Sequence, residues 1–196
     1  MSTAWKIAGG TASVLLLAAG PIRALARGTE QASYTVLMTQ GAFELRQYAP
    51  MVVAETVVET GDFDDASNEG FRRLAGFIFG KNRTRGNIPM TAPVTMESGP
   101  GGWVMQFVMP SEYSMETLPQ PVDPRVTLRP LAGRRMAALR FSGRGSDAQM
   151  QEKEAALRQL LDRSSMRPSG RAIYARYNAP MVPPFLRRNE VLVPLM

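Results

Sequence analysis

Asn87-Ile88-Pro89-Met90-Thr91-Ala92-Pro93-Val94-Thr95-Met96 is the stretch, near the middle of the chain, on which the interpretation of the fold depends. Its residues are mostly apolar or β-branched, as in a strand, yet it contains two prolines four residues apart. Proline fixes φ and lacks a backbone donor, so this segment suits neither a helix interior nor an ordinary central strand. We therefore expect a strand entered through a kink, with Thr91-Ala92-Pro93 at a sheet edge or a bulge.

The segments on either side of this stretch divide into strands, two helices and proline-rich connections. The first helix is expected over residues 63–79, because Asp62 suits an N-cap and apolar residues recur every three or four positions. A second helix opens at Ser146, with Gln149 completing a capping box. Strands are expected at residues 34–38, 43–48, 51–59, 103–109, 126–131, 134–141, 172–177 and 191–193.

These elements occur in the same order twice, at about residues 34–109 and 125–196, with a crossing linker at residues 110–124. In each half we expect paired strands, a helix, a strand carrying an x-Ala-Pro sequence and a closing strand. Thr91-Ala92-Pro93 would then correspond to Asn178-Ala179-Pro180, and residues 126–131 and 134–141 would pair through a turn at Ala132-Gly133. The pattern predicts an α+β fold in which an internal duplication forms a distorted antiparallel β-barrel, with two α-helices packed outside.

The N-terminal segment, residues 1–26, resembles a targeting sequence. Lys6 precedes an uncharged run from Ile7 to Ile22, and Ala24-Leu25-Ala26 has the small-x-small pattern of a cleavage site. The run is short for a membrane span, which needs about 20 apolar residues. We expect a cleaved signal peptide and export to the periplasm or the extracellular space, followed by a linker at residues 27–33. Membrane anchoring through the uncleaved segment is the alternative.

Composition excludes several classes of chemistry. The chain has no Cys and no His, which removes thiolate and Ser-His nucleophiles, and metal or haem ligation by either residue. The net charge is +6, and removal of Lys6 and Arg23 with the leader lowers it to +4. This charge is compatible with acidic ligands or an anionic membrane surface. Nucleic acid is not an expected partner, because the basic residues are scattered and do not alternate with aromatic ones.

Four motifs in order resemble the SOUL haem-binding family, and the resemblance runs from Tyr34 to Val193. They are Phe43-Glu44-Leu45-Arg46-Gln47-Tyr48, Gly80-Lys81-Asn82, Met90-Thr91-Ala92-Pro93-Val94-Thr95 and Arg188-Asn189-Glu190-Val191. The resemblance implies a distorted barrel of two similar halves with two helices. It also implies non-covalent binding of haem or another tetrapyrrole, a planar hydrophobic ligand, in an apolar surface groove. That groove lies beside the first helix and the late proline-rich loop.

The family's binding positions transfer only in part. Gln47 stands where the SOUL protein has the His proposed as axial ligand. The positions that are basic in the related haem-binding protein are matched here by Asn68, Gly76 and Val182, none of which is basic. The apolar groove positions transfer as Phe71 and Ala75 on the helix and Met181 in the loop. The resemblance therefore implies the fold more strongly than the site.

A tetrapyrrole needs a flat apolar slot and cations for its carboxylates. Arg72, Arg187 and Arg188 are the candidate cations, and a solvated Arg72 beside a helix stripe that only packs the core is the structural alternative. Met181 is the methionine that we would test as an iron ligand, with Tyr48 and Tyr177 as weaker candidates. We interpret Arg188-Asn189-Glu190 as structural: an Arg–carboxylate pair that starts the last strand. The slot would be built from Phe71, Leu74, Ala75, Ile78, Met181, Val182 and Phe185.

Three functions from different classes fit these residues. The first is non-enzymatic binding or carriage of haem or another tetrapyrrole. The second is a general module that sequesters or senses hydrophobic small molecules, since similar duplicated halves occur in the effector-binding domains of multidrug-responsive regulators. An enzyme that modifies a tetrapyrrole ranks last, because no acid–base pair is evident in the sequence.

Overall fold

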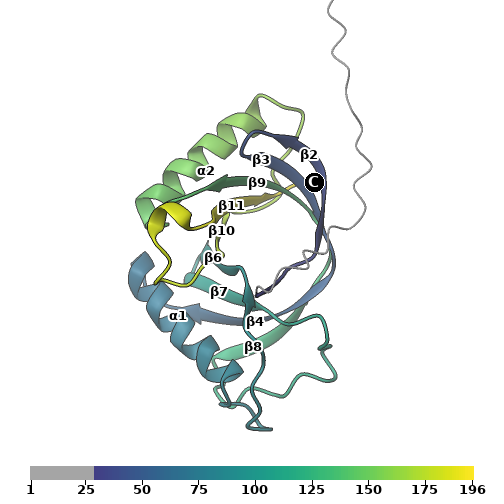
Figure 1. Ribbon diagram of the computed structural model, residues 1–196, viewed down its shortest axis with the longest axis vertical. Coiled ribbons are helices and arrows are strands. Elements are labelled where there is room, and N and C mark those ends of the chain that lie inside the picture. The colour runs from purple at the N-terminus through teal and green to yellow at the C-terminus, as the bar shows by residue number, and fades with distance from the viewer. Residues whose placement is uncertain (1–28) are drawn as a thin grey trace, which may run out of the picture.

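The computed structural model describes residues 29–196, so the predicted signal peptide or anchor lies outside the described residues. Two helices and eleven strands are found in this part of the chain (Figure 1). Within it, no helix combines the length and the hydropathy that crossing a bilayer requires. The elements are β1 (Glu30–Gln31), β2 (Tyr34–Gln40), β3 (Phe43–Tyr48), β4 (Met51–Val58), α1 (Phe63–Ile78), β5 (Thr91–Ala92), β6 (Val94–Gly99), β7 (Gly102–Val108), β8 (Val126–Leu131), β9 (Arg135–Phe141), α2 (Asp147–Asp162), β10 (Ile173–Arg176), the 3₁₀ turn η1 (Pro184–Leu186) and β11 (Asn189–Pro194).

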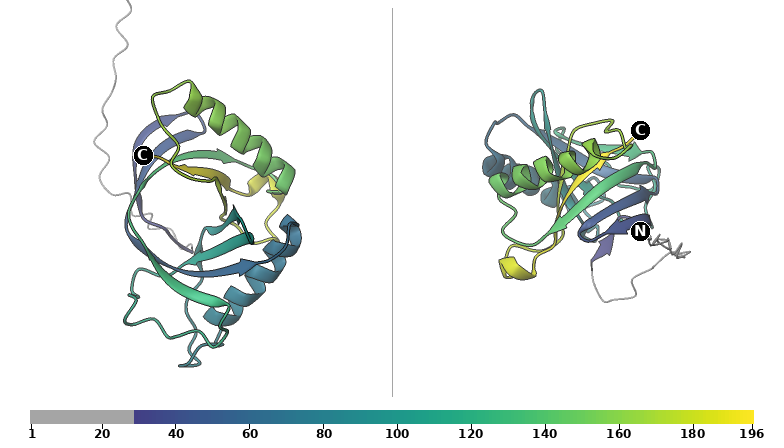
Figure 2. Two further views of the ribbon diagram at one scale, coloured as in Figure 1. Left: turned by 180° about the vertical axis from the view of Figure 1, so that it is seen from behind. Right: turned by 90° about the horizontal axis from the view of Figure 1, so that it is seen from above.

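Nine of the strands form one antiparallel sheet in the order β2-β3-β9-β11-β10-β6-β7-β4-β8. The sheet curls strongly, and both helices lie outside the curl, as Figure 1 and the reverse view in Figure 2 show. Helix α1 packs on β4, β7 and β8, whereas α2 packs on β9 and β11. The predicted fold class, an α+β distorted barrel with two outer helices, is confirmed.

A long ladder of strand pairs joins the two halves of the molecule. Gln47 of β3 lies opposite Arg135 of β9, and Met51 of β4 lies opposite Leu131 of β8. The β3–β4 segment and the β8–β9 segment therefore run antiparallel with the same register in both strand pairs. The predicted hairpin between residues 126–131 and 134–141 is therefore wrong: β8 pairs with β4, and β9 pairs with β3 and β11. The chain continues past Gly133 without reversing, and it runs so close to β3 there that a Cβ on Gly133 would lie 2.7 Å from the Tyr48 carbonyl oxygen.

The strand order is symmetric about the β10–β6 pair, reading β3-β9-β11-β10 on one side and β8-β4-β7-β6 on the other. The two x-Ala-Pro sequences are not equivalent in this arrangement. Thr91-Ala92-Pro93 leads into β6, whereas Asn178-Ala179-Pro180 follows β10. Because Arg176 lies opposite Val94, the two sequences meet at one end of the β6–β10 pair. Internal duplication stays a prediction that rests on the order of the elements.

The central stretch enters the sheet as expected from its prolines. Thr91 and Ala92 form β5, which pairs in parallel with β1, and the Ala92–Pro93 peptide bond is cis. Strand β6 then begins at Val94 and pairs with β7 and β10. Pro93 thus separates two short pairings instead of interrupting one long strand.

Local signals place both helices, but only one of the two expected caps forms. Asp62 accepts a hydrogen bond from the Asp65 backbone N–H at 2.8 Å and so caps α1. Ser146 precedes α2, yet its side chain makes no capping hydrogen bond. Gln149 accepts from the N–H of Gly145, the residue before the N-cap, at 2.9 Å, so the predicted capping box does not form. The apolar face of α2 is buried through Met150, Leu157 and Leu161.

The inner face of the curl is partly polar. Arg46 donates to Glu190 through Nη1 at 2.6 Å and Nη2 at 2.9 Å. Arg188 Nε donates to the same carboxylate at 2.9 Å, and the Tyr177 hydroxyl donates to it at 2.8 Å. Burial alone would raise the pKa of Glu190, but these hydrogen bonds and cationic charges hold the pKa below its usual value. The interpretation of Arg188-Asn189-Glu190 as structural is therefore supported by the contacts.

Candidate functional site

Helix α1 carries a row of partly exposed side chains in which Phe71 is the large apolar residue. Asn68, Phe71 and Ala75 lie along it at helical spacing, and Phe79 follows the helix. The Phe71 ring meets the Phe107 ring edge-on with centroids 5.4 Å apart, yet Phe71 remains 41% exposed. Phe79 is 61% exposed. Leu74 and Ile78, in contrast, are fully buried core residues, so the predicted slot keeps Phe71 and Ala75 but loses these two.

A second exposed apolar surface lies in the loop at residues 178–187. Met181 is 88% exposed and Phe185 is 74% exposed, while Val182 is half-buried. Arg187 Nε donates to the Val182 carbonyl at 2.6 Å, and the Gly143 N–H donates to the Pro184 carbonyl at 2.9 Å. The loop is therefore held in a defined shape against the segment that precedes α2.

Arg176 connects α1 to the segment that precedes α2. Its Nη1 donates to Ser67 Oγ of α1 at 2.9 Å, and its Nη2 donates to the Gly145 carbonyl at 2.7 Å. Its guanidinium also lies 4.8 Å from the centre of the Phe63 ring. Among residues 29–196, no hydrogen bond, ion pair or ring contact joins Phe71 or Ala75 directly to the loop. Arg176 thus holds α1 against the Gly145 segment, and the two apolar surfaces do not close on each other.

The predicted carboxylate-binding arginines differ in availability. Arg72 pairs with Glu69 one helical turn away, and its side chain is 77% exposed. Arg187 is engaged by main-chain carbonyls of its own loop. Arg188 is committed to Glu190 and also donates to Tyr34 at 3.2 Å. Of the three, only Arg72, on α1, presents its guanidinium to solvent.

Lys81 is a cation that sequence reasoning left without a role. A Cβ built on Gly76 would lie 3.2 Å from Lys81 Cδ, so the lysine stem covers the helix where Gly76 has no side chain. Gly76 is one of the positions at which the expected basic residue is missing. Lys81 follows the helix by three residues, and its N–H donates to the Gly76 carbonyl at 2.8 Å. The feature of the sequence that could have pointed to Lys81 is Gly76, because a glycine leaves room for a neighbouring side chain.

The candidate iron ligands are widely separated. Gln47 lies on β3, near the opposite edge of the sheet from the strands beneath α1, and its Nε2 donates to the Tyr48 carbonyl at 3.2 Å. Burial raises the pKa of both Tyr48 and Tyr177, and both hydroxyls belong to the Arg46–Glu190 network. A tyrosinate ligand is therefore disfavoured at either position. Met181 alone among these candidates has an accessible side chain near the predicted groove.

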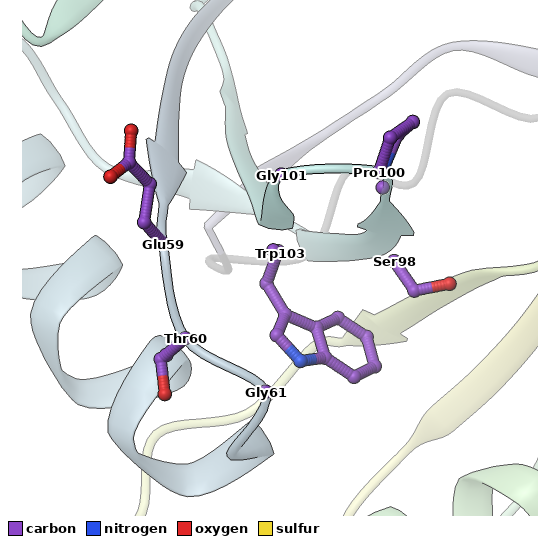
Figure 3. A pocket seen from close by; sticks show the side chains of 9 residues that line it. Glu59, Thr60, Gly61, Ser98, Pro100, Gly101 and Trp103 are labelled. Carbon is purple, nitrogen blue, oxygen red and sulfur yellow. The ribbon is translucent and has the colours of Figure 1, made fainter.

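Two hollows lie away from the predicted site. The larger, about 660 Å³, is formed by residues 59–61 and 98–103 where β4 ends beside the β6–β7 hairpin. Figure 3 shows that its wall is mainly backbone and the Trp103 indole, with the Glu59 side chain directed away from the indole. The second encloses about 380 Å³ between residues 30–33 and 108–116. Neither is lined by the six predicted binding residues, which are Asn68, Phe71, Arg72, Ala75, Met181 and Val182.

The described residues offer no ready metal site. None of their Asp and Glu side chains gather in a group of three that would hold an ion. The fold and surface together define a class of protein: a curled antiparallel sheet with two outer helices and exposed apolar side chains on one helix and one loop.

Comparisons with known proteins identify the family. The family model described as SOUL heme-binding protein matches residues 29–194, and this chain belongs to that family. The chain is 33% identical to heme-binding protein 2 of Homo sapiens over 159 residues, which cover 77% of each chain. It is 29% identical to heme-binding protein 1 of Xenopus laevis over 157 residues, covering 76% of this chain and 82% of that protein. Heme binding is thereby supported at the level of the family.

Solved structures show the same fold at low sequence identity. The C-terminal domain of EcmrR superposes with a TM-score of 0.62 and 8% identity, covering 83% of this chain and 98% of that one. A hydrolase from Listeria innocua gives a TM-score of 0.56 and 12% identity, covering 82% and 94%. At these identities the similarity concerns the fold alone.

Proposed function

We propose that this protein binds haem or a related tetrapyrrole non-covalently and carries it without chemical turnover. The observation that supports this most directly is the exposure of Phe71 on α1 and Phe79 after it, in a chain of the SOUL heme-binding family. Phe71 and Phe79 are large apolar side chains with much of their surface exposed, and burial of such surface by a flat ligand is favourable. Ligand binding would remove this surface from water.

The residues present suit an apolar planar ligand with acidic groups. Phe71 and Ala75 would provide the apolar contact, and Arg72 on the helix and Lys81, whose stem lies over Gly76, would meet carboxylates. Met181 is the side chain available to ligate iron from the loop, through its sulfur. Bound haem would supply an iron centre and an intense absorption band. The protein's own residues would supply the contact surface and the charges.

A hemin titration tests the proposal. The full chain should give a saturable Soret shift with one hemin per chain, and an unrelated protein of similar basic charge serves as the control. A response no larger than that of the control would overturn the proposal. The same titration with protoporphyrin IX, which lacks iron, separates ring recognition from iron ligation, because binding through the apolar surface and Lys81 does not need the metal.

General sequestration of hydrophobic molecules is the second candidate. It is favoured by the non-basic residues at Asn68, Gly76 and Val182 and by the absence of His, which weaken any requirement for haem itself. In that case planar hydrophobic compounds without carboxylates should raise the melting temperature as much as hemin does at equal saturation. A rise confined to tetrapyrroles favours the first function.

We further propose that the protein is exported with the help of residues 1–26. The uncharged run and the Ala24-Leu25-Ala26 sequence support this. Expression of the full gene in a Gram-negative host, followed by mass spectrometry of the periplasmic fraction, should give a chain that starts at Arg27. Recovery of the intact chain in the membrane fraction would indicate anchoring instead, and recovery in the cytosol would contradict export.

A further inference from the structure

The 380 Å³ hollow is a second candidate binding site, distant in sequence from α1 and the late loop. It lies where β4 begins and β7 and β8 end, beside the start of the linker at residues 110–124. Its volume is within the range of cavities that hold small organic ligands. Its lining comes from residues 30–33, 50–52, 108–111, 113–116 and 130–131, together with Thr91.

One wall of this hollow is the short segment at residues 30–33, which is held across it by a few hydrogen bonds. The Ser111 N–H donates to Glu30 Oε1 at 2.8 Å, connecting the segment to the linker. The Ala32 N–H donates to the Ala92 carbonyl at 3.2 Å, and the Ala49 N–H donates to the Ser33 carbonyl at 3.0 Å. The hollow therefore has a defined wall formed from a distant part of the chain.

The charges around the hollow differ from those of the protein as a whole. The chain has 23 basic and 17 acidic residues, yet the charged residues that line the hollow are Glu30 and Glu116, with no Lys or Arg among them. Glu116 accepts a hydrogen bond from Ser114 Oγ at 2.6 Å. That bond holds the pKa of its carboxyl below the usual value, so Glu116 is ionised at neutral pH.

The remaining lining is mainly apolar, with one aromatic ring. Three methionines, three prolines, two valines, Leu131 and Tyr113 supply most of it. Methionine side chains adapt to ligands of different shape, and an aromatic face attracts a cation through its quadrupole. Two carboxylates, an aromatic ring and mainly apolar side chains in the lining together complement a lipophilic cation better than an anion such as a tetrapyrrole carboxylate.

We propose that this hollow is a binding site for a small aromatic cation of the quaternary ammonium type, distinct from the haem surface on α1. The cation would lie near Glu116 and Tyr113, and the aromatic group would contact the apolar side chains of the lining. Binding here requires no residue of α1, so the inference holds whether or not the protein binds haem.

The test compares two probes of similar size and opposite charge on the full chain. Phenyltrimethylammonium should bind saturably by isothermal titration calorimetry, and benzenesulfonate should bind at least tenfold more weakly. Because the protein is basic, a non-specific response would favour benzenesulfonate. Equal binding of both probes, or no saturable binding of the cation at millimolar concentrations, would overturn the proposal.

Variants then locate the site. Glu116→Lys should weaken phenyltrimethylammonium binding about tenfold or more, whereas Glu112→Lys, which changes the charge equally on an exposed residue outside the lining, should leave it nearly unchanged. Both side chains are exposed, so neither change should unfold the protein. An equal loss in the two variants would show general electrostatics and contradict the site. Phe71→Ala should not affect the cation, and a loss there would place binding on α1 instead.

Discussion

Arg46 on β3 and Glu190 on β11 reach each other across the intervening strand β9 and join through two hydrogen bonds of 2.6 and 2.9 Å. Arg46 is 1% exposed and Glu190 is completely buried. The pair therefore ties three strands together on the inner face of the curl. Its geometry is the two-pronged arrangement that guanidinium and carboxylate groups favour.

Loss of Arg46 should be costly. Arg46→Met keeps most of the side-chain volume but leaves Glu190 with only Arg188 and Tyr177 as polar partners. Because removal of one partner of a buried ion pair typically costs about 3–5 kcal/mol, we expect the free energy of unfolding to fall by about 3 kcal/mol. Urea unfolding measures the change, with Arg72→Met as the control, since Arg72 belongs to an exposed pair. An equal loss of unfolding free energy in the two variants would contradict the expectation that the buried pair contributes more to stability than the exposed one.

Gly102 is a position where backbone geometry excludes a side chain. Its φ is +121°, and an added Cβ would lie 2.1 Å from the Val58 carbonyl oxygen. Gly102→Ala should therefore destabilise the β6–β7 hairpin against β4 by about 2–3 kcal/mol. Gly101→Ala is the matched control, because nothing lies within 4 Å of a Cβ at that position. Thermal unfolding of the two variants gives the comparison, and similar melting temperatures would disprove the contact.

Glu97 should make stability depend on pH. Burial raises the pKa of its carboxyl, and Arg134 and Arg171 only partly offset this effect. The folded state thus favours the protonated form, a contribution present below the unfolded pKa of about 4.3 and lost as pH rises through the folded pKa. Glu97→Gln should then stabilise the protein at pH 7 by less than about 1 kcal/mol and have no effect near pH 4. Urea unfolding at both pH values measures this; stabilisation that is equal at the two would contradict the assignment.

Phe71 offers a direct test of the haem surface. Truncation to Ala removes a ring whose burial by a ligand would contribute about 1.5–3 kcal/mol, so hemin affinity should fall tenfold or more. Leu160 on α2 is the control, because it is 42% exposed and Phe71 is 41% exposed. Leu160→Ala should leave the hemin dissociation constant unchanged. Unchanged affinity in both variants would move the site away from α1.

Met181 tests iron ligation separately from ring binding. If its sulfur ligates the iron, Met181→Ala should shift the Soret band of the hemin complex while protoporphyrin IX binding stays within about twofold of wild type. Leu186→Ala changes another exposed apolar side chain of the same loop and should preserve the spectrum. Identical spectra for wild type and Met181→Ala would exclude the sulfur as a ligand.

The elements of the fold were predictable because their signals are local. The sequence Phe43-Glu44-Leu45-Arg46-Gln47-Tyr48 alternates as a strand and is one, and Asp62 caps α1 as its position suggested. The pairing of β8 and β9 was not predictable in this way. Ala132-Gly133 is typical of a turn, but in the structure this segment continues alongside Tyr48 and Pro50, which lie more than 80 residues earlier in the sequence.

Among the candidate binding residues, too, some features follow from local sequence and others depend on distant parts of the chain. The exposure of Phe71 and the placement of Met181 in a loop follow from helical spacing and proline content. The commitment of Arg188 to Glu190 does not, because it depends on Arg46, Tyr34 and Tyr177 arriving from other strands. The 380 Å³ hollow could not be predicted from the sequence either, because its walls come from segments that are separated along the chain.

The continuous register between β3–β4 and β8–β9 has a consequence for cleavage of the chain between its two halves. Each of these long strand pairs takes one member from each half of the chain, so a cut in the linker at residues 110–124 would leave both fragments with an unpaired edge. Neither fragment would form a closed folding unit, and the two should regain structure only by complementation when mixed. We therefore expect the protein to unfold as one cooperative unit, whatever the ancestry of its halves.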